Sequence, residues 1–139
     1  MVHVTDDGIF DAPVDKVWKY LTDQNGHSHS GERFSKVLEQ TDKGMTVEVE
    51  VKNPDGSLHK ETWKITLNPP KGHHTEVLAG PTKGSSNTHT YTPMGDKTKV
   101  VVEGDFFAEG MDGAATKKAV LAMFETVFNE DNAQLKNYK

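Results

Sequence analysis

Residues 45–52 read MTVEVEVK, and apolar and polar side chains alternate along the whole run. The same alternation returns in residues 62–67, which read TWKITL, and again in residues 99–106. Because successive side chains of a strand point to opposite faces, this period of two gives a sheet with one apolar face and one wet face. The three runs therefore predict antiparallel strands that bury one side.

Clusters of turn-forming residues separate these runs, and they fall at residues 42–44, 53–56, 68–70, 80–81 and 93–96. Glycine and proline clusters about a dozen residues apart are typical of a β-meander. We therefore expect about six strands in the central part of the chain. Gly104 lies inside the last run and predicts a bulge or bend there.

Two segments predict helices. Residues 13–22 begin at Pro13, which suits a first helical position, and carry apolar side chains at helical spacing. Residues 113–136 follow Asp112, a suitable N-cap, and lack proline throughout. A helix that long needs a sheet to cover its apolar face. We therefore expect an α+β fold: a curved antiparallel sheet of about seven strands wrapped around the C-terminal helix, with the short helix after strand 1.

Composition limits the kinds of partner. The 139 residues suit a single domain, 1–139, and the net charge of −5 provides no basic field for nucleic acid. The chain has no cysteine, no apolar run long enough to span a membrane and no secretory signal at its start. We expect a cytoplasmic protein that is a monomer or a weak dimer.

Residues 11–23, DAPVDKVWKYLTD, resemble the opening segment "A-P-x-x-x-V-W-x-x-L-x-D" of the START/Bet v 1-like superfamily, also called SRPBCC or polyketide cyclase/dehydratase-like proteins. Residues 91–100 resemble its penultimate hairpin "P-x-G-x-x-T-x-V". With the element order, the resemblance spans nearly the whole chain. It implies a helix-grip fold with a hydrophobic cavity between the sheet and the long helix. Family members bind lipids, hormones or polyketides, activate a chaperone, or catalyse cyclisations and dehydrations. Residues 26–33 depart from the family in being strongly polar.

The alternation of side chains along two strands predicts that several polar side chains can lie together on the concave face. If the apolar side chains of residues 62–67 face the concave side, Glu61 and His59 do so too, while Asn87, His89 and Tyr91 share one parity of their own strand. If all of them point inward, Glu61, His89 and Tyr91 are candidates for general acid–base catalysis on a bound carbonyl compound. The alternative is that the Asn/His/Tyr face points outward, which is common because antiparallel sheets often keep one face in water.

The familiar catalytic motifs are absent from the sequence, and we expect no cofactor. Two histidine pairs, His27 with His29 and His73 with His74, have residue types that bind metals, but each lies in a polar or proline-rich segment typical of solvated loops. We therefore predict no metal site. His59 and Glu61 would lie near the rim of the cavity.

The leading hypothesis is a module that binds a small hydrophobic or amphipathic molecule. The alternatives are a cyclase or dehydratase acting on a small polyketide-like carbonyl compound, and a protein-interaction module similar to chaperone activators. Methionine and aromatic side chains, Met45 among them, are suited to line such a cavity. The residues we predict to contact the ligand are Val47, Val49, Trp63, Ile65, Asn87, His89, Tyr91, Val102, Phe106, Val120, Met123, Phe124 and Val127.

Overall fold

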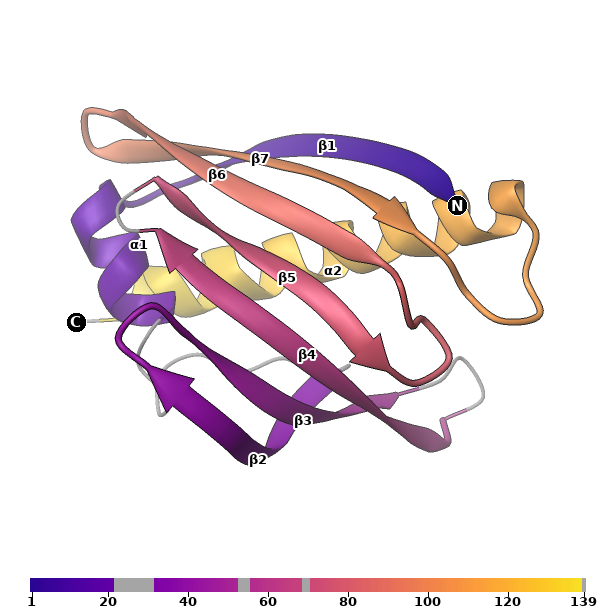
Figure 1. The fold of residues 1–139 in the computed structure, drawn as a ribbon. Coiled ribbons are helices and arrows are strands. Elements are labelled where there is room, and N and C mark those ends of the chain that lie inside the picture. Colours follow the sequence, from indigo (N-terminus) through magenta and orange to yellow (C-terminus); the bar gives the residue numbers. More distant parts are fainter. Residues whose placement is uncertain (22–31, 53–55, 69–70, 139) are drawn as a thin grey trace.

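The protein is built from one curved antiparallel sheet and two helices (Figure 1). The structure is a computed structural model and describes residues 1–21, 32–52, 56–68 and 71–138, with the backbone alone for 32–35. The elements are β1 (Val2–Phe10), α1 (Val14–Leu21), β2 (Glu32–Thr41), β3 (Gly44–Lys52), β4 (Leu58–Asn68), β5 (Gly72–Ala79), β6 (Ser86–Met94), β7 (Lys97–Phe106) and α2 (Gly113–Asn137). The predicted α+β fold is confirmed.

The strand order is β1-β7-β6-β5-β4-β3-β2, and every neighbouring pair is antiparallel. Strands β2 to β7 follow the chain as a meander, while β1 joins the far edge by pairing with β7. The first and last strands in the sequence are therefore neighbours. This pairing puts α1, which follows β1, at the end of the sheet beside β6 and β7.

Helix α2 begins where the sequence predicts. The Asp112 carboxylate accepts a hydrogen bond from the Ala115 backbone N–H at 2.7 Å, which satisfies one of the free donors of the first turn. The helix then continues to Asn137 without a proline to break it. The predicted N-cap and the predicted long helix are both confirmed.

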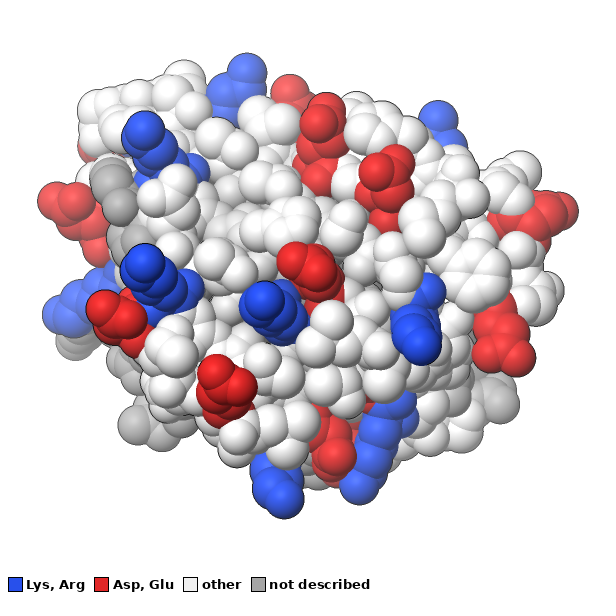
Figure 2. Space-filling view, in the orientation of Figure 1, with Lys and Arg blue, Asp and Glu red and all other residues white. Residues whose placement is uncertain are grey.

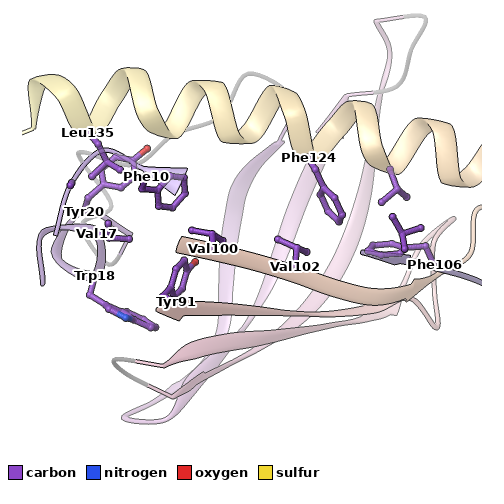
Figure 3. Packing of buried hydrophobic residues seen from close by; sticks show 13 residues of the cluster. Phe10, Val17, Trp18, Tyr20, Tyr91, Val100, Val102, Phe106, Phe124 and Leu135 are labelled. Atoms are coloured by element: carbon purple, nitrogen blue, oxygen red, sulfur yellow. The ribbon is translucent and has the colours of Figure 1, made fainter. Parts of the chain in front are cut away.

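Helix α2 lies across one face of the sheet and packs against β1 and β7 (Figure 1). Figure 3 shows Val100 and Val102 pointing from β7 toward the helix and Phe124 pointing back toward the sheet. The Phe124 ring meets the Phe106 ring edge to face, with centroids 5.7 Å apart. The buried apolar cluster consists of Val4, Phe10, Ala12, Val17, Trp18, Tyr20, Tyr91, Val100, Val102, Phe106, Val120, Phe124 and Leu135.

Gly104 corrects one expectation. The pairing of β7 with β1 and with β6 runs through this residue without a register shift, so Gly104 is not a bulge. A Cβ atom there would collide with the Ser86 carbonyl oxygen and would lie 2.7 Å from the Asn87 Cα. The glycine is needed because β6 approaches β7 closely beside Asn87.

The opposite face of the sheet carries mixed charge. Figure 2 shows acidic and basic side chains interspersed over the side turned away from α2. Such a surface has no extended field of one sign that would attract a nucleic-acid backbone. Among the described residues, neither helix combines the length and apolar character that crossing a membrane requires.

Candidate functional site

The side of the sheet turned toward α2 is called the concave face here. Val102 of β7 is buried beneath α2, and it lies directly opposite His89 of β6, which in turn lies opposite His73 of β5. Directly paired residues of antiparallel strands project on the same side. His89 and His73 therefore face the concave side, and so do Asn87 and Tyr91, which lie two residues before and after His89.

Four rings form an aromatic cluster at the α1 end of this face. His73 and His89 stack with centroids 4.4 Å apart, and the Tyr91 hydroxyl shares a 2.9 Å hydrogen bond with His73 Nε2. Trp18 of α1 meets the Tyr91 ring edge to face at 5.5 Å and closes the cluster from the end of the sheet (Figure 3). The two histidines are thus held in fixed orientations by neighbours from three elements.

Burial changes how this cluster titrates. The pKa of His89 is lowered well below its ordinary value of 6.5, first because the ring is removed from water and second because His73 lies against it. The pKa of the Tyr91 hydroxyl is raised, again chiefly by burial and then by the charge of Asp131. At neutral pH both groups are therefore uncharged and act as hydrogen-bonding groups rather than as ions.

Two buried polar atoms on β6 lack a hydrogen-bond partner within the described part of the chain: Asn87 Oδ1 and His89 Nδ1. Such groups are rare in folded proteins because each costs about 1–3 kcal/mol when it is removed from water and left unpaired. A pair of them on one strand and one face calls for a functional explanation.

Glu61 of β4 lies on the same face in a separate polar cluster. Its carboxylate is 4% exposed and accepts hydrogen bonds from His59 Nε2 at 2.8 Å and from Trp63 Nε1 at 2.9 Å. The Thr82 hydroxyl donates a third bond at 2.8 Å. These three bonds stabilise the buried carboxylate and fix its position.

The structure therefore does not assemble the three residues we considered for catalysis. Tyr91 and His89 lie in the aromatic cluster on β6, whereas Glu61 lies two strands away on β4 with His59, Trp63 and Thr82 as its partners. Alternation along a strand predicts which face a side chain takes but not how many strands separate two such residues. A proton relay from Glu61 to His89 has no support in this arrangement.

The predicted lining residues divide into three groups. Those that are buried are Val47, Val49, Tyr91, Val102, Phe106, Val120 and Phe124. Those that are half-buried are Trp63, Ile65, Asn87, His89 and Val127, and Met45 is half-buried as well. Met123 is 42% exposed and does not face the sheet, because the next residue, Phe124, occupies the buried stripe and one residue turns a helix by about 100°. The cavity itself stays a prediction.

His73 and His74 do not form the metal site we considered for that pair. His73 and His74 lie within β5 rather than in a loop, so their side chains point to opposite faces. The hydrogen bonds agree, since His73 meets Tyr91 on the concave side and His74 Nδ1 meets the Thr88 hydroxyl on the exposed side at 2.7 Å. The pair His27 and His29 lies outside the described residues.

His73 is the residue that sequence reasoning missed. Asn68 pairs with Gly72, which puts Leu67 opposite His73, and Leu67 belongs to the apolar parity of its strand. Counting outward from that pair would have assigned His73 to the concave face. Thr82 gave no such signal, because it lies in a turn after β5 and reaches Glu61 only through the fold.

The protein also has a pocket towards the β2 edge of the sheet, where β2, β3 and β4 meet. It has a volume of about 240 Å³ and is lined by Glu39, Thr41, Lys43, Gly44, Met45, Thr46, Lys64, Ile65 and Thr66. Met45 and Ile65 of this lining share the parity of the concave face, whereas Thr46, Lys64 and Thr66 have the opposite parity.

Comparison with family models assigns nearly the whole chain. A model described as "Polyketide cyclase / dehydrase and lipid transport" matches residues 1–138. A search of curated proteins found no match.

Solved structures agree on the fold. A START superfamily protein from Mycobacterium smegmatis superposes with a TM-score of 0.82 at 12% identity, covering 99% of each chain. A protein from Thermus thermophilus gives 0.78 at 13% identity, covering 97% of each chain. The Zhui aromatase/cyclase from a Streptomyces species gives 0.71 at 18% identity, covering 96% of this chain and 90% of that one. Identities this low establish a shared fold and leave the activity to be argued from the site.

Proposed function

The chain belongs to the polyketide cyclase / dehydrase and lipid transport family, and from that premise we propose that it binds a small apolar or amphipathic molecule against the concave face of its sheet. The molecule would lie between the sheet and α2, over β4, β5 and β6. Its apolar part would contact the side chains of β4, and its polar end would meet the aromatic cluster of β5 and β6.

One observation carries this proposal: the concave face has half-buried side chains beyond the area that α2 covers. The helix packs mainly on β1 and β7, whereas Trp63, Ile65 and Leu67 of β4 keep part of their surface accessible. Apolar surface gains about 25 cal/mol for each Å² removed from water. A ligand that covers these side chains gains that free energy, and a mixed apolar and polar wall is typical of small-molecule sites.

The geometry of the described residues favours neither alternative. A cyclase or dehydratase reaction would need an acid and a base at one place, and Glu61 is separated from His89 and Tyr91. A protein-interaction surface would need exposed apolar side chains gathered together. Those of the described residues come from several elements, among them Ile9 of β1, Leu38 of β2 and Met123 of α2.

The test is binding of a neutral hydrophobic fluorophore, N-phenylnaphthylamine, whose emission rises in an apolar site. We expect saturable binding to the native protein. We expect Ile65→Asp to abolish it, because a carboxylate would then lie among the half-buried side chains of the concave face. Amide chemical shifts mapped by NMR on the unmodified protein should move on β4, β5 and β6.

The matched control is Ile9→Asp. Ile9 is 47% exposed on β1 and its side chain points to the face opposite that of its buried neighbour Phe10, so the same substitution leaves the concave face unchanged. Binding should survive in this variant. If the native protein does not bind the fluorophore, or if the shifts map to the exposed face, the proposal is wrong.

A further inference from the structure

Asn87 and His89 present two buried polar atoms to the same side of β6. Asn87 Oδ1 and His89 Nδ1 have no partner among the described residues, and the two positions are next neighbours on one face of the strand. The residues opposite them on β7 are Gly104 and Val102, which offer no side-chain hydrogen bond. The fold therefore leaves two neighbouring hydrogen-bonding side chains on the concave face with an unpaired buried atom each.

The charge around these atoms is unfavourable for an anion. Among the described residues the buried charged side chains are the carboxylates of Glu61 and Asp131, and both are acidic. The residues of β5 that pair with Asn87 and His89 are Thr75 and His73, neither of which carries a fixed charge. Burial also lowers the pKa of His89, so the ring is neutral and supplies no cation.

We infer that the bound molecule carries an uncharged hydroxyl, of the alcohol or phenol type, at the end that faces Asn87 and His89. A hydroxyl has one donor and two acceptor positions, so it can donate to Asn87 Oδ1 while it accepts from His89 Nδ1–H. A carboxylate can only accept, so it leaves Asn87 Oδ1 unpaired, and the described residues offer it no buried cation. This inference rests on the proposed function, since it concerns the polar end of the same ligand.

Three probes with one apolar body separate the possibilities: ethylbenzene, 4-ethylphenol and 4-ethylbenzoate. Each is measured by displacement of N-phenylnaphthylamine from the native protein. We expect 4-ethylphenol to bind about tenfold more tightly than ethylbenzene, the gain expected from one or two net hydrogen bonds. We expect 4-ethylbenzoate to bind no better than ethylbenzene, because it loses its hydration without gaining a cation.

Two variants test whether Asn87 and His89 cause the preference for 4-ethylphenol over ethylbenzene. Asn87→Leu and His89→Phe remove the polar atoms and keep much of the volume, so each should reduce the advantage of 4-ethylphenol toward onefold while ethylbenzene still binds. The matched control is Asn129→Leu on the exposed side of α2, which should keep the full preference. Either single variant suffices if the other fails to fold.

The outcomes distinguish the inference from the proposal on which it rests. If ethylbenzene displaces the fluorophore and 4-ethylphenol is no better, the inference is wrong and the binding function stands. If 4-ethylbenzoate is the tightest of the three, the inference is wrong because the site selects an anion. If neither the fluorophore nor any probe binds, the proposed function itself is overturned.

Discussion

Glu61 is a residue on which both the stability and the shape of the concave face depend. Its buried carboxylate accepts bonds from His59, Trp63 and Thr82, which come from β4 and from the turn after β5. We predict that Glu61→Leu lowers the free energy of unfolding by about 3 kcal/mol, because three donors lose this acceptor at once. Glu61→Gln, which keeps one acceptor oxygen, should cost roughly half as much. Urea denaturation measures both.

The exposed Glu109 supplies the control for these variants, since it follows β7 and its side chain lies in water. Glu109→Leu should change the free energy of unfolding by no more than about 0.5 kcal/mol. Equal costs at the two positions would mean that the hydrogen bonds of Glu61 contribute nothing beyond a surface glutamate.

His89 predicts a pH dependence of stability. Its pKa in the folded protein is lowered well below 6.5, whereas the unfolded chain takes up a proton near the ordinary value of 6.5. Below that pH the unfolded state binds more protons than the folded state, so the free energy of unfolding falls as the pH falls, by up to about 1.4 kcal/mol per pH unit. Above about pH 7 this contribution is constant.

The comparison that isolates this effect is His89→Phe, which keeps a ring against His73 and removes the titrating group. Urea denaturation between about pH 8 and pH 5 should give a weaker acid loss for the variant than for the native protein. The remaining histidines are common to both proteins; His3, whose pKa is raised by its hydrogen bond to Asp105, is one of them. Parallel curves for the two proteins would show that His89 becomes charged without cost in the fold.

At the level of elements, helix α2 packs closely against β1 at Gly8. The Phe128 ring lies over Gly8, and a Cβ atom on that glycine would be 2.7 Å from Phe128 Cε1. We predict that Gly8→Ala lowers the free energy of unfolding by about 1–3 kcal/mol, because the ring or the strand must move. The double variant Gly8→Ala/Phe128→Leu should recover part of this loss. Thermal and urea denaturation measure all of these variants.

The control for this prediction is a second glycine to alanine change in the same layer. Gly113 begins α2, and a Cβ atom there would meet nothing within 4 Å. Gly113→Ala should leave stability unchanged or raise it by up to about 1 kcal/mol, since alanine reduces the freedom of the unfolded chain. If both glycine variants lose the same stability, the contact with Phe128 is not the cause.

Helices and strands were predictable from the sequence where their buried face is apolar. They were not predictable where the buried face carries polar residues. Helix α2 follows from the Asp112 cap and an unbroken stripe, and β3 follows from strict alternation of valine with charged residues. In β5 the concave positions include His73 and Thr75, so alternation of apolar and polar residues gives no signal and the segment resembles a loop. The candidate site lies on the polar part of the concave face, which periodicity describes least well.

The same reason explains why the sequence predicts that alternate residues of β6 share a face but not which face of the sheet that is. Asn87, His89 and Tyr91 alternate with threonines, so both faces of the strand are polar in sequence. The direction is decided by register: His89 pairs with Val102, and α2 covers Val102 from a distant part of the chain. Long-range pairing, rather than local pattern, brings the residues of the site together.

At the scale of the whole molecule, the chain is closed by contacts between its two ends. Strand β1 pairs with β7, and α1 meets the C-terminal part of α2 through Tyr20, whose hydroxyl lies 2.7 Å from Asp131 Oδ1 and 2.8 Å from Gln134 Oε1. Tyr20 is fully buried and Asp131 is 4% exposed. The helix that covers the concave face is therefore held at its far end by the helix that carries Trp18. The contact between α1 and α2 therefore contributes to the stability of the fold and also fixes the position of the helix that covers the site.

This closure predicts different effects for two tyrosines that lie at the same helix junction. Tyr20→Phe removes the hydroxyl that donates to the buried Asp131, so the free energy of unfolding should fall by about 2 kcal/mol. Tyr138→Phe removes a hydroxyl whose bond to the Lys19 carbonyl is long, 3.4 Å, and exposed, so the loss should stay below about 0.5 kcal/mol. Because the contact joins residues far apart in the chain, unfolding of Tyr20→Phe should remain one cooperative transition at a lower urea midpoint. Amide exchange should increase most in α1 and in the last turns of α2. Equal losses in the two variants would mean that the Tyr20 hydroxyl does not hold the helices together, and that α2 is fixed by its packing on β1 alone.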